Sequence, residues 1–217
     1  MTHEEQTTRG PSLSTCVGKT ATKLQDDYLG SHGDRAQAHA RGVLATLRRS
    51  AGNTAMSNPL AMESVLFEMT PALSEHLVGK GDRPSPSEEA AFNAVTFFAL
   101  HMQGAQQPAH IQGQSFARAC GLLNMRRDSN SLKPRFDAIL LAHDARARLI
   151  HIRSLIQLLR TEAIGFDYGR FATDLRSLND PRYRNGVLIR WSSDFAQAHF
   201  NSTNSSKNQP KGFQKCH

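Results

Sequence analysis

Apolar residues recur along most of this chain at the three- and four-residue spacing of an amphipathic helix. In the stretch after Asp34, for example, Val43, Leu44 and Leu47 fall on one side. No segment shows the sustained alternation of apolar and polar positions that marks a half-buried strand. The pattern therefore predicts an all-α protein, a compact bundle of about seven to nine helices.

Helix start and stop signals give this bundle its order along the chain. Helices are expected to begin near residues 34, 59, 86, 115, 132, 145, 168 and 181. The clearest start is Ser85-Pro86 with Glu88, which has the composition of a capping box. The helix that follows, "AAFNAVTFFALHMQ", is apolar nearly all round and is expected to form the centre of the core. Gly165 is expected to close the helix that begins at 145, and Asp167 to cap the next one.

The two ends of the chain show weaker patterns. Residues 1–33 are polar, and we expect a flexible N-terminal extension with one short helix or an anchoring turn at most. Residues 34–200 form the predicted helical domain, and the linker-like stretch at 79–86 leaves open a division into two small lobes. Residues 201–217 are low in hydrophobicity and are expected to form a disordered tail.

Charge is distributed unevenly over the 217 residues. Residues 1–117 carry nine Lys or Arg against eleven Asp or Glu, whereas residues 118–190 carry fourteen against seven. A basic excess can simply keep a surface soluble. Because this excess is regional and rich in arginine, it favours an anionic partner such as nucleic acid.

Motifs for catalysis or for cofactor and metal binding are absent from the sequence. "VGKT" at 17–20 resembles part of a phosphate-binding loop, but Leu13 stands where the full motif needs glycine. Neither the ten histidines nor the three cysteines make a metal-ligand pattern. We therefore expect no enzymatic activity and no cofactor. The sequence also lacks a membrane-spanning apolar run and a signal peptide, so the expected location is the cytoplasm, with no membrane partner.

The most informative stretch is "RLIHIRSLIQLLRTEAIGFDYGRF", which begins at Arg148. Arg146, Arg153 and Arg160 recur every seven residues through it. At about 100° per residue these three arginines form a stripe that borders the apolar face of the helix. Boundary arginines often lay their stems on apolar surface and point the head group into water. The alternative is that the stripe follows a phosphate backbone.

Further arginines lie close to this helix in sequence, and one pair lies elsewhere. Arg118 is on the short helix that begins near 115, and Arg135 opens the helix that begins near 132. Between them, Arg126 and Arg127 are expected to lie in a turn. Helices that are close in sequence usually pack as neighbours, so these side chains are expected to converge. The complete set of nucleic-acid candidates is Arg48, Arg49, Arg118, Arg126, Arg127, Arg135, Arg153 and Arg160.

Four stretches together resemble the CasB family, the small subunit of the type I-E CRISPR surveillance complex, Cascade. They are "ARGVLATLRRSAG", "EEAAFNAVTFFALHMQ", "GQSFARACGLL" and "KPRFDAILLAHDARARLIHIRSLIQLLRTEAIGFDYGRFATDL". Each motif is short, and their order and spacing carry the resemblance over about residues 34–200. The departures are the two ends of the chain and Lys133, which stands where paired arginines are common.

The resemblance implies an all-helical, non-catalytic subunit that helps hold the hybrid of crRNA and target DNA and the displaced strand of the R-loop. Its implied partners are the crRNA-binding backbone subunits, the large subunit and a second copy of the chain. By position, the resemblance assigns nucleic-acid contacts to Arg49, Arg118, Arg135 and Arg153. Arg48, Arg126, Arg127 and Arg160 are added from the distribution of charge alone.

Two other functions compete with this one. A free-standing helical DNA-binding regulator would need a helix-turn-helix with polar, base-reading side chains on its second helix, and the junctions here lack Asn and Gln at that face. A small helical enzyme with an acidic substrate would need a nucleophile, a metal site or an acid–base pair, and none is recognisable.

Overall fold

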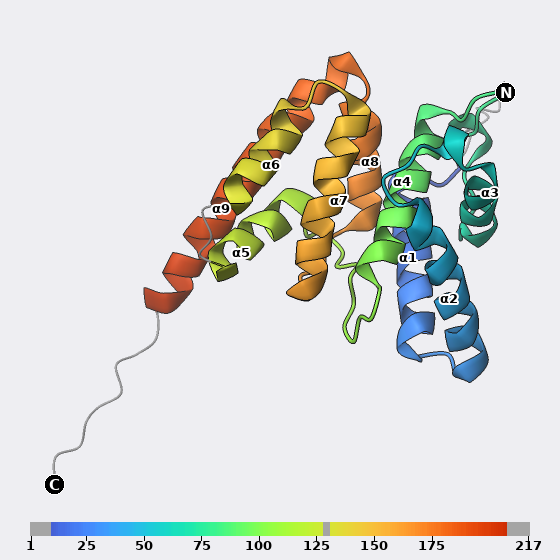
Figure 1. Ribbon diagram of the computed structural model, residues 1–217, viewed down its shortest axis with the longest axis horizontal. Coiled ribbons are helices and arrows are strands. Elements are labelled where there is room, and N and C mark those ends of the chain that lie inside the picture. The colour runs from blue at the N-terminus through green and yellow to red at the C-terminus, as the bar shows by residue number, and fades with distance from the viewer. Residues whose placement is uncertain (1–9, 128–130, 208–217) are drawn as a thin grey trace, which may run out of the picture.

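A computed structural model describes residues 10–127 and 131–207, and the regular elements of this part of the chain are helices joined by loops (Figure 1). It contains nine α-helices, three short 3₁₀ turns and no strand, apart from an isolated bridge between His110 and Phe166. The α-helices are α1 (Leu13–Leu29), α2 (Asp34–Leu47), α3 (Pro59–Glu68), α4 (Pro86–His101), α5 (Phe116–Arg127), α6 (Leu132–Leu141), α7 (Ala145–Thr161), α8 (Tyr168–Leu178) and α9 (Pro181–Lys207). The predicted all-α class is confirmed.

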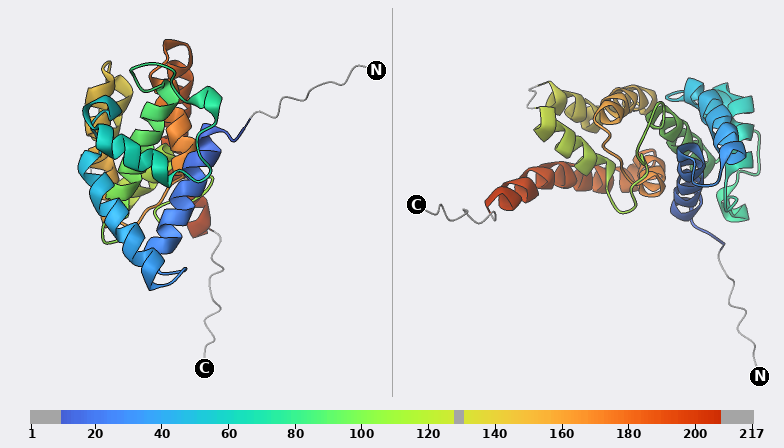
Figure 2. Two further views of the ribbon diagram at one scale, coloured as in Figure 1. Left: turned by 90° about the vertical axis from the view of Figure 1, so that its right-hand side faces the viewer. Right: turned by 90° about the horizontal axis from the view of Figure 1, so that it is seen from below.

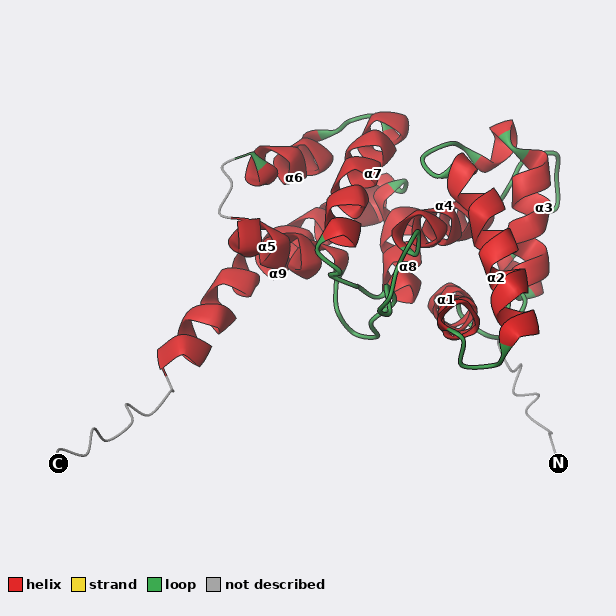
Figure 3. Cartoon of the chain, turned by 60° about the horizontal axis from the view of Figure 1, so that its bottom comes forward, coloured by secondary structure: helices red, strands yellow, loops and turns green. Residues whose placement is uncertain are grey.

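The helices form two halves that share α8. Helices α1, α2 and α3 lie on one side of α4, and α5, α6, α7 and α9 lie on the other side (Figures 1 and 3). Although α8 follows α7 in sequence, it packs against both α1 and α4. The two further views show the molecule to be elongated, with α9 running out along one end (Figure 2).

Helix α4 is the centre of the core, as its sequence predicted. The Ser85 hydroxyl accepts a hydrogen bond from the Glu88 N–H at 3.0 Å, and the Glu88 carboxylate accepts one from the Ser85 N–H at 2.7 Å. This reciprocal pair is the expected capping box. Phe92, Phe97 and Phe98 are fully buried, because α1, α2, α7 and α8 all pack around this helix.

The N-terminal region differs from its expected flexible character. Residues 13–29 form the 17-residue helix α1, capped by Ser12 at its start and by Gly30, in a left-handed conformation, at its end. Its inward face includes Cys16, Val17, Thr20 and Ala21. These small side chains give a weak hydrophobic pattern, but they let α1 approach α8 closely. A Cβ atom added to Gly169 of α8 would lie only 2.3 Å from the Ser14 carbonyl oxygen.

Other boundaries also differ from expectation. Arg126 and Arg127, expected in a turn, form the last turn of α5. The left-handed residue after α7 is Ala163 (φ 50°) and not Gly165. Helix α9 continues to Lys207, beyond the expected end near residue 200, and residues 208–217 of the predicted tail lie outside the described part of the chain.

Candidate nucleic-acid interface

Helix α7 has the two-sided character that its sequence indicated. Leu149, Ile152, Leu155, Ile156 and Leu159 are buried along one face. Asp144 caps the helix by accepting a hydrogen bond from the Ala147 N–H at 2.9 Å. With the helix held in this rotation, the stripe of Arg146, Arg153 and Arg160 runs along the edge of the buried face, where the periodicity placed it.

The middle arginine of this stripe reaches across to the end of α2. The Arg153 guanidinium donates a hydrogen bond to the Ala51 carbonyl, 102 residues away in sequence. Ala51 directly follows the 3₁₀ turn Arg48–Ser50, so Arg48 and Arg49 lie within three residues of this contact. Arg49 is exposed, and its side chain makes no hydrogen bond or ion pair with any residue in the described ranges. The structure therefore brings the early arginine pair next to the middle of α7.

Arg160 contacts the segment after α4 in the same way. Its Nη1 donates to the Gln103 carbonyl at 3.3 Å, while its buried Nε has no hydrogen-bond partner among the described residues. Next to it, His101 is 2% exposed and hydrogen-bonds through Nδ1 to the Tyr168 hydroxyl at 2.9 Å. Burial, and secondly the charge of Arg160, lower the pKa of His101 from 6.5 to about 3. His101 is consequently a neutral core residue beside a cationic surface residue.

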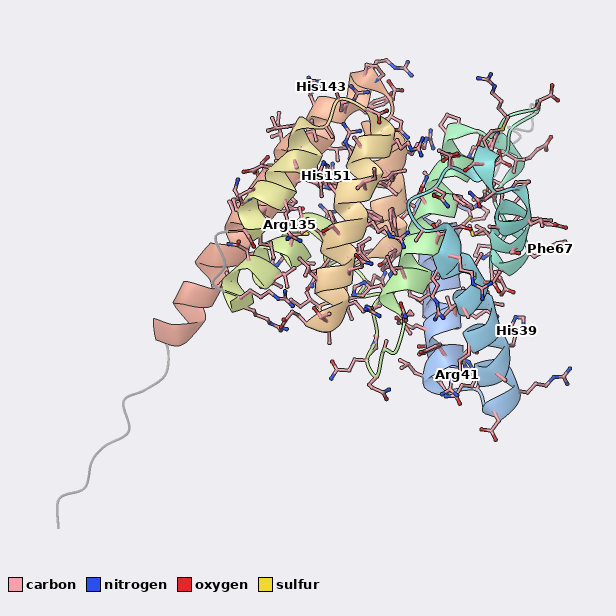
Figure 4. The ribbon with its side chains drawn as sticks, in the orientation of Figure 1. His39, Arg41, Phe67, Arg135, His143 and His151 are labelled. Carbon is pink, nitrogen blue, oxygen red and sulfur yellow. The ribbon has the colours of Figure 1, made fainter. Side chains whose placement is uncertain are left out.

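Helix α6 contributes from the other flank of α7. Arg135 is exposed, and its Nη1 lies 3.3 Å from the Ser154 hydroxyl, one residue after Arg153. Figure 4 shows Arg135 on α6 and His151 on the neighbouring α7. Lys133, the position where the chain departs from the family pattern, is paired with Asp137 on its own helix. Arg135 is thus the cation of this helix that contacts α7.

Arg126 and Arg127 meet the far end of α7, where they are partly neutralised. The Arg127 Nε donates to the Glu162 carboxylate at 2.9 Å and its Nη2 donates to the Thr161 hydroxyl at 2.9 Å. The Arg126 Nη1 donates to the Glu162 carbonyl at 3.0 Å. The Glu162 carboxylate therefore offsets the charge of Arg127, in contrast to Arg49.

Arg118 is the candidate that the structure does not join to the others by a contact. It lies in the first turn of α5 and is half-buried, and its backbone N–H donates to the Ser115 hydroxyl at 3.1 Å. Its side chain forms no hydrogen bond with the rest of the described chain. It shares a helix face with Leu122 and Arg126, four and eight residues further along α5.

One arginine that the sequence reasoning passed over has a structural role. Arg148 is 3% exposed, and its Nε donates to the Ile139 carbonyl at 3.3 Å while Nη2 donates to the Ala142 carbonyl. These bonds satisfy carbonyls at the end of α6, and burial lowers the pKa of Arg148. Counted at 100° per residue from Leu149, Arg148 lies at about 260° around the helix, on the side that Ile152, Leu155 and Leu159 also occupy. This position was the signal in the sequence that Arg148 is buried.

The arrangement suits contacts to a nucleic-acid backbone. Arginine presents five N–H donors in a planar fork that matches phosphate, and Arg153, Arg160 and Arg135 each use only part of theirs on the protein. No group of three or more His, Cys, Asp or Glu in residues 10–127 and 131–207 is placed to hold a metal ion. Over the same residues, no helix is both long and apolar enough to span a membrane.

A family model, CRISPR-associated protein Cse2, matches residues 43–195, which is more than two thirds of the chain. This chain belongs to the Cse2 family. The family, also called CasB, is that of the non-catalytic small subunit of the type I-E CRISPR surveillance complex, so the resemblance inferred from the sequence is confirmed.

Solved structures agree with this assignment of the fold. CasB from Thermobifida fusca is 24% identical, with a TM-score of 0.66 over 84% of this chain and 97% of that one. A Cse2-family protein from Thermus thermophilus is 25% identical, with a TM-score of 0.57 over 83% and 97% of the two chains. A chain described as belonging to a CRISPR RNA-guided surveillance complex is 17% identical, with a TM-score of 0.58 over 88% and 99%. No curated protein sequence shows significant similarity to this Cse2 protein.

Proposed function

We propose that this Cse2 protein binds the nucleic acids of the surveillance complex through arginine–phosphate contacts around α7, and so helps to hold the crRNA–target hybrid and the displaced strand. The observation that carries the proposal is the meeting of Arg153 with the end of α2. It places a cation of α7 beside Arg48 and Arg49, while Arg135 adds a cation from α6.

Contacts of this kind fit the task of a small subunit. In an RNA-guided complex, base pairing reads the sequence, so the protein needs to recognise only the backbone. Strand separation is a nearly balanced exchange of one duplex for another, and modest binding of the displaced strand shifts it. The region between residues 118 and 190 supplies the positive charge for this role.

The protein partners are part of the same proposal. The backbone subunits that bind crRNA, the large subunit and a second copy of this chain are the partners implied by the family. Support comes from the similarity in fold to a chain of an RNA-guided surveillance complex. Co-purification of this chain with the other subunits and crRNA is the direct test.

Backbone binding is tested with the four arginines that the family resemblance selects. We expect Arg49→Glu, Arg118→Glu, Arg135→Glu and Arg153→Glu each to weaken binding of nonspecific DNA, with a negative slope of log affinity against log salt that reflects several phosphates. Arg35→Glu on α2 makes the same change of charge at an exposed position outside the interface and is the control. Wild-type binding by all four variants at low salt, or a salt-independent affinity, would contradict the proposal.

A further inference from the structure

A cavity of about 450 Å³ opens where α4, the start of α7 and the end of α8 meet. This volume lies within the range of about 300–1,000 Å³ that is typical of small-ligand sites. Its inner wall consists of buried apolar side chains, including Ala90, Leu149, Leu175 and Leu178. Exposed residues, among them Met56 and Thr54, surround its mouth.

One polar group beside the inner wall lacks a partner but is not open to the cavity. Asn93 is 4% exposed, and its Nδ2 donates to the Glu89 carbonyl at 2.9 Å and to the Glu89 carboxylate at 3.1 Å. These two acceptors fix the orientation of the amide, so the remaining atom is Oδ1, an acceptor. Asn93 Oδ1 receives no hydrogen bond from any described residue. Because Oδ1 is closed off from solvent, it does not reach a ligand in the cavity, and recognition there depends on the apolar wall and the charged mouth.

The charge around the cavity favours an anion at the same site. Arg83 and Arg146 line the exposed mouth, and Arg148 lines the buried part. Among the described residues that line it, only Glu89 is acidic, and its carboxylate already accepts hydrogen bonds from the Ala55 N–H at 3.1 and 3.2 Å. The lining therefore combines an apolar interior with two exposed guanidinium groups at the mouth.

We propose that this cavity takes one unpaired nucleotide, with its base against the apolar wall and its phosphate at Arg146 and Arg83. Protein pockets that hold an extruded base enclose it between apolar or aromatic side chains. A base that is paired and stacked within a duplex cannot enter the cavity, so the site selects single strands.

Arg146 connects the cavity to the rest of the interface. It is the first arginine of the α7 stripe and lies about 10 Å along the helix from Arg153. A strand that follows the stripe therefore passes the mouth of the cavity. The inference rests on the proposed function in one respect, because that function supplies the nucleotide as part of a bound strand. A free mononucleotide has the same chemistry and would bind the cavity without that function.

The decisive measurement compares two single strands of equal length and phosphate number, one of deoxycytidine and one abasic. With the full-length protein, we expect the base-bearing strand to bind about five-fold or more tightly, which is the size of effect expected for one captured base. Both strands should show the same salt dependence, because they carry the same phosphates. Equal affinities for the two strands would overturn the inference and leave backbone binding intact.

A variant locates the effect in the cavity. Ala145 is exposed, begins α7 and lines the mouth, so Ala145→Trp obstructs the cavity without changing charge. We expect this variant to bind both strands equally, whereas Ala38→Trp, at an exposed position on α2, keeps the wild-type preference. A preference that survives Ala145→Trp would place base recognition elsewhere and reject the site. The comparison of strands on the wild type stands alone if this variant fails to fold.

A second arm, calorimetric titration with deoxycytidine monophosphate, distinguishes the two sources. In one outcome, neither strand binds, the mononucleotide binds, and Ala145→Trp abolishes that binding. The proposed function is then wrong, and the cavity is a binding site for a free nucleotide. If the base-bearing strand binds preferentially and the mononucleotide binds weakly, the strand is the source. If the strands do not bind and the mononucleotide does not bind, both the function and the site are rejected.

Discussion

The guanidinium of Arg153 is hydrogen-bonded to the backbone carbonyl of Ala51, which ties the middle of α7 to the end of α2. Arg153 therefore holds two helices together and presents its remaining donors at the surface. Arg49, two residues before Ala51, is exposed and makes no such bond within the described chain. Two arginines at one place in the candidate interface thus differ in their contacts with the rest of the protein.

This difference predicts how their variants separate. Arg49→Glu should weaken DNA binding with no change in the free energy of unfolding. Arg153→Glu should weaken binding and also lower the free energy of unfolding by about 1.5–3 kcal/mol, because a charged hydrogen bond is lost. Urea denaturation together with DNA titration checks both. An Arg153→Glu variant as stable as Arg49→Glu would show that the contact to Ala51 contributes nothing.

Glu162 is expected to restrain binding at the far end of α7. Its carboxylate accepts a hydrogen bond from Arg127 at 2.9 Å and competes there with phosphate. Glu162→Gln should therefore raise the affinity for DNA at low salt by about two- to five-fold, the effect of one nearby charge in water. Stability should change by less than about 1 kcal/mol, because the pair is partly exposed. Unchanged or weaker binding would place Arg127 outside the DNA contact.

His101 predicts a loss of stability in mild acid. Its pKa is about 3 in the folded protein and 6.5 in the unfolded chain, so only the unfolded chain takes up a proton between these values. The contribution of neutral His101 is complete above about pH 6.5 and falls by about 1.4 kcal/mol for each pH unit below it, down to about pH 3. Urea denaturation at pH 7, 6 and 5 measures this slope.

The same substitution at two histidines supplies the test and its control. His101→Gln should flatten the pH dependence, whatever its effect on stability at pH 7. His143→Gln, at an exposed position, should keep the wild-type slope. If the His101 variant loses stability in acid as steeply as the wild type does, another group is responsible.

The contact between α1 and α8 predicts a destabilising glycine substitution. Gly169→Ala would bring a Cβ atom within 2.3 Å of the Ser14 carbonyl oxygen, and we expect a cost of about 1–3 kcal/mol from overpacking. Gly42→Ala is the matched control, since nothing lies within 4 Å of its added Cβ. In an exposed helix that change should stabilise by about 0.5–1 kcal/mol. Thermal unfolding of the two variants should shift in opposite directions, and equal shifts would contradict the close packing.

Local signals allowed most of the fold to be read from the sequence. Ser85 and Asp167 accept the capping hydrogen bonds that their positions indicated, and the helices of residues 34–200 begin close to where they were expected. The full length of helix α1 was not predicted, because Cys16, Thr20 and Ala21 are small or polar and give little hydrophobic pattern. Their burial depends on Gly169, about 150 residues further along the chain, which no local pattern reveals.

The candidate interface was readable only in outline. The helical period placed Arg153 and Arg160 at the edge of the buried face of α7 correctly. It could not show that Arg153 bonds to Ala51 or that Glu162 pairs with Arg127, since these contacts join distant parts of the chain. Arg148 was passed over because arginine is rarely buried, although its position on the wheel lies within the apolar arc. The nucleic-acid contacts of all eight candidates stay predictions.

The place of α8 between α1 and α4 sets an order for biosynthesis. Tyr168 and Phe171 of α8 pack against Phe98 and Phe97 of α4, so the first half of the molecule takes its central aromatic contacts from the second. A nascent chain cannot complete this packing until residue 178 has left the ribosome. Up to that point the parts of α1 and α4 that face α8 stay uncovered, so we expect the growing chain to be a substrate for chaperones. Folding should then finish as one late event instead of half by half.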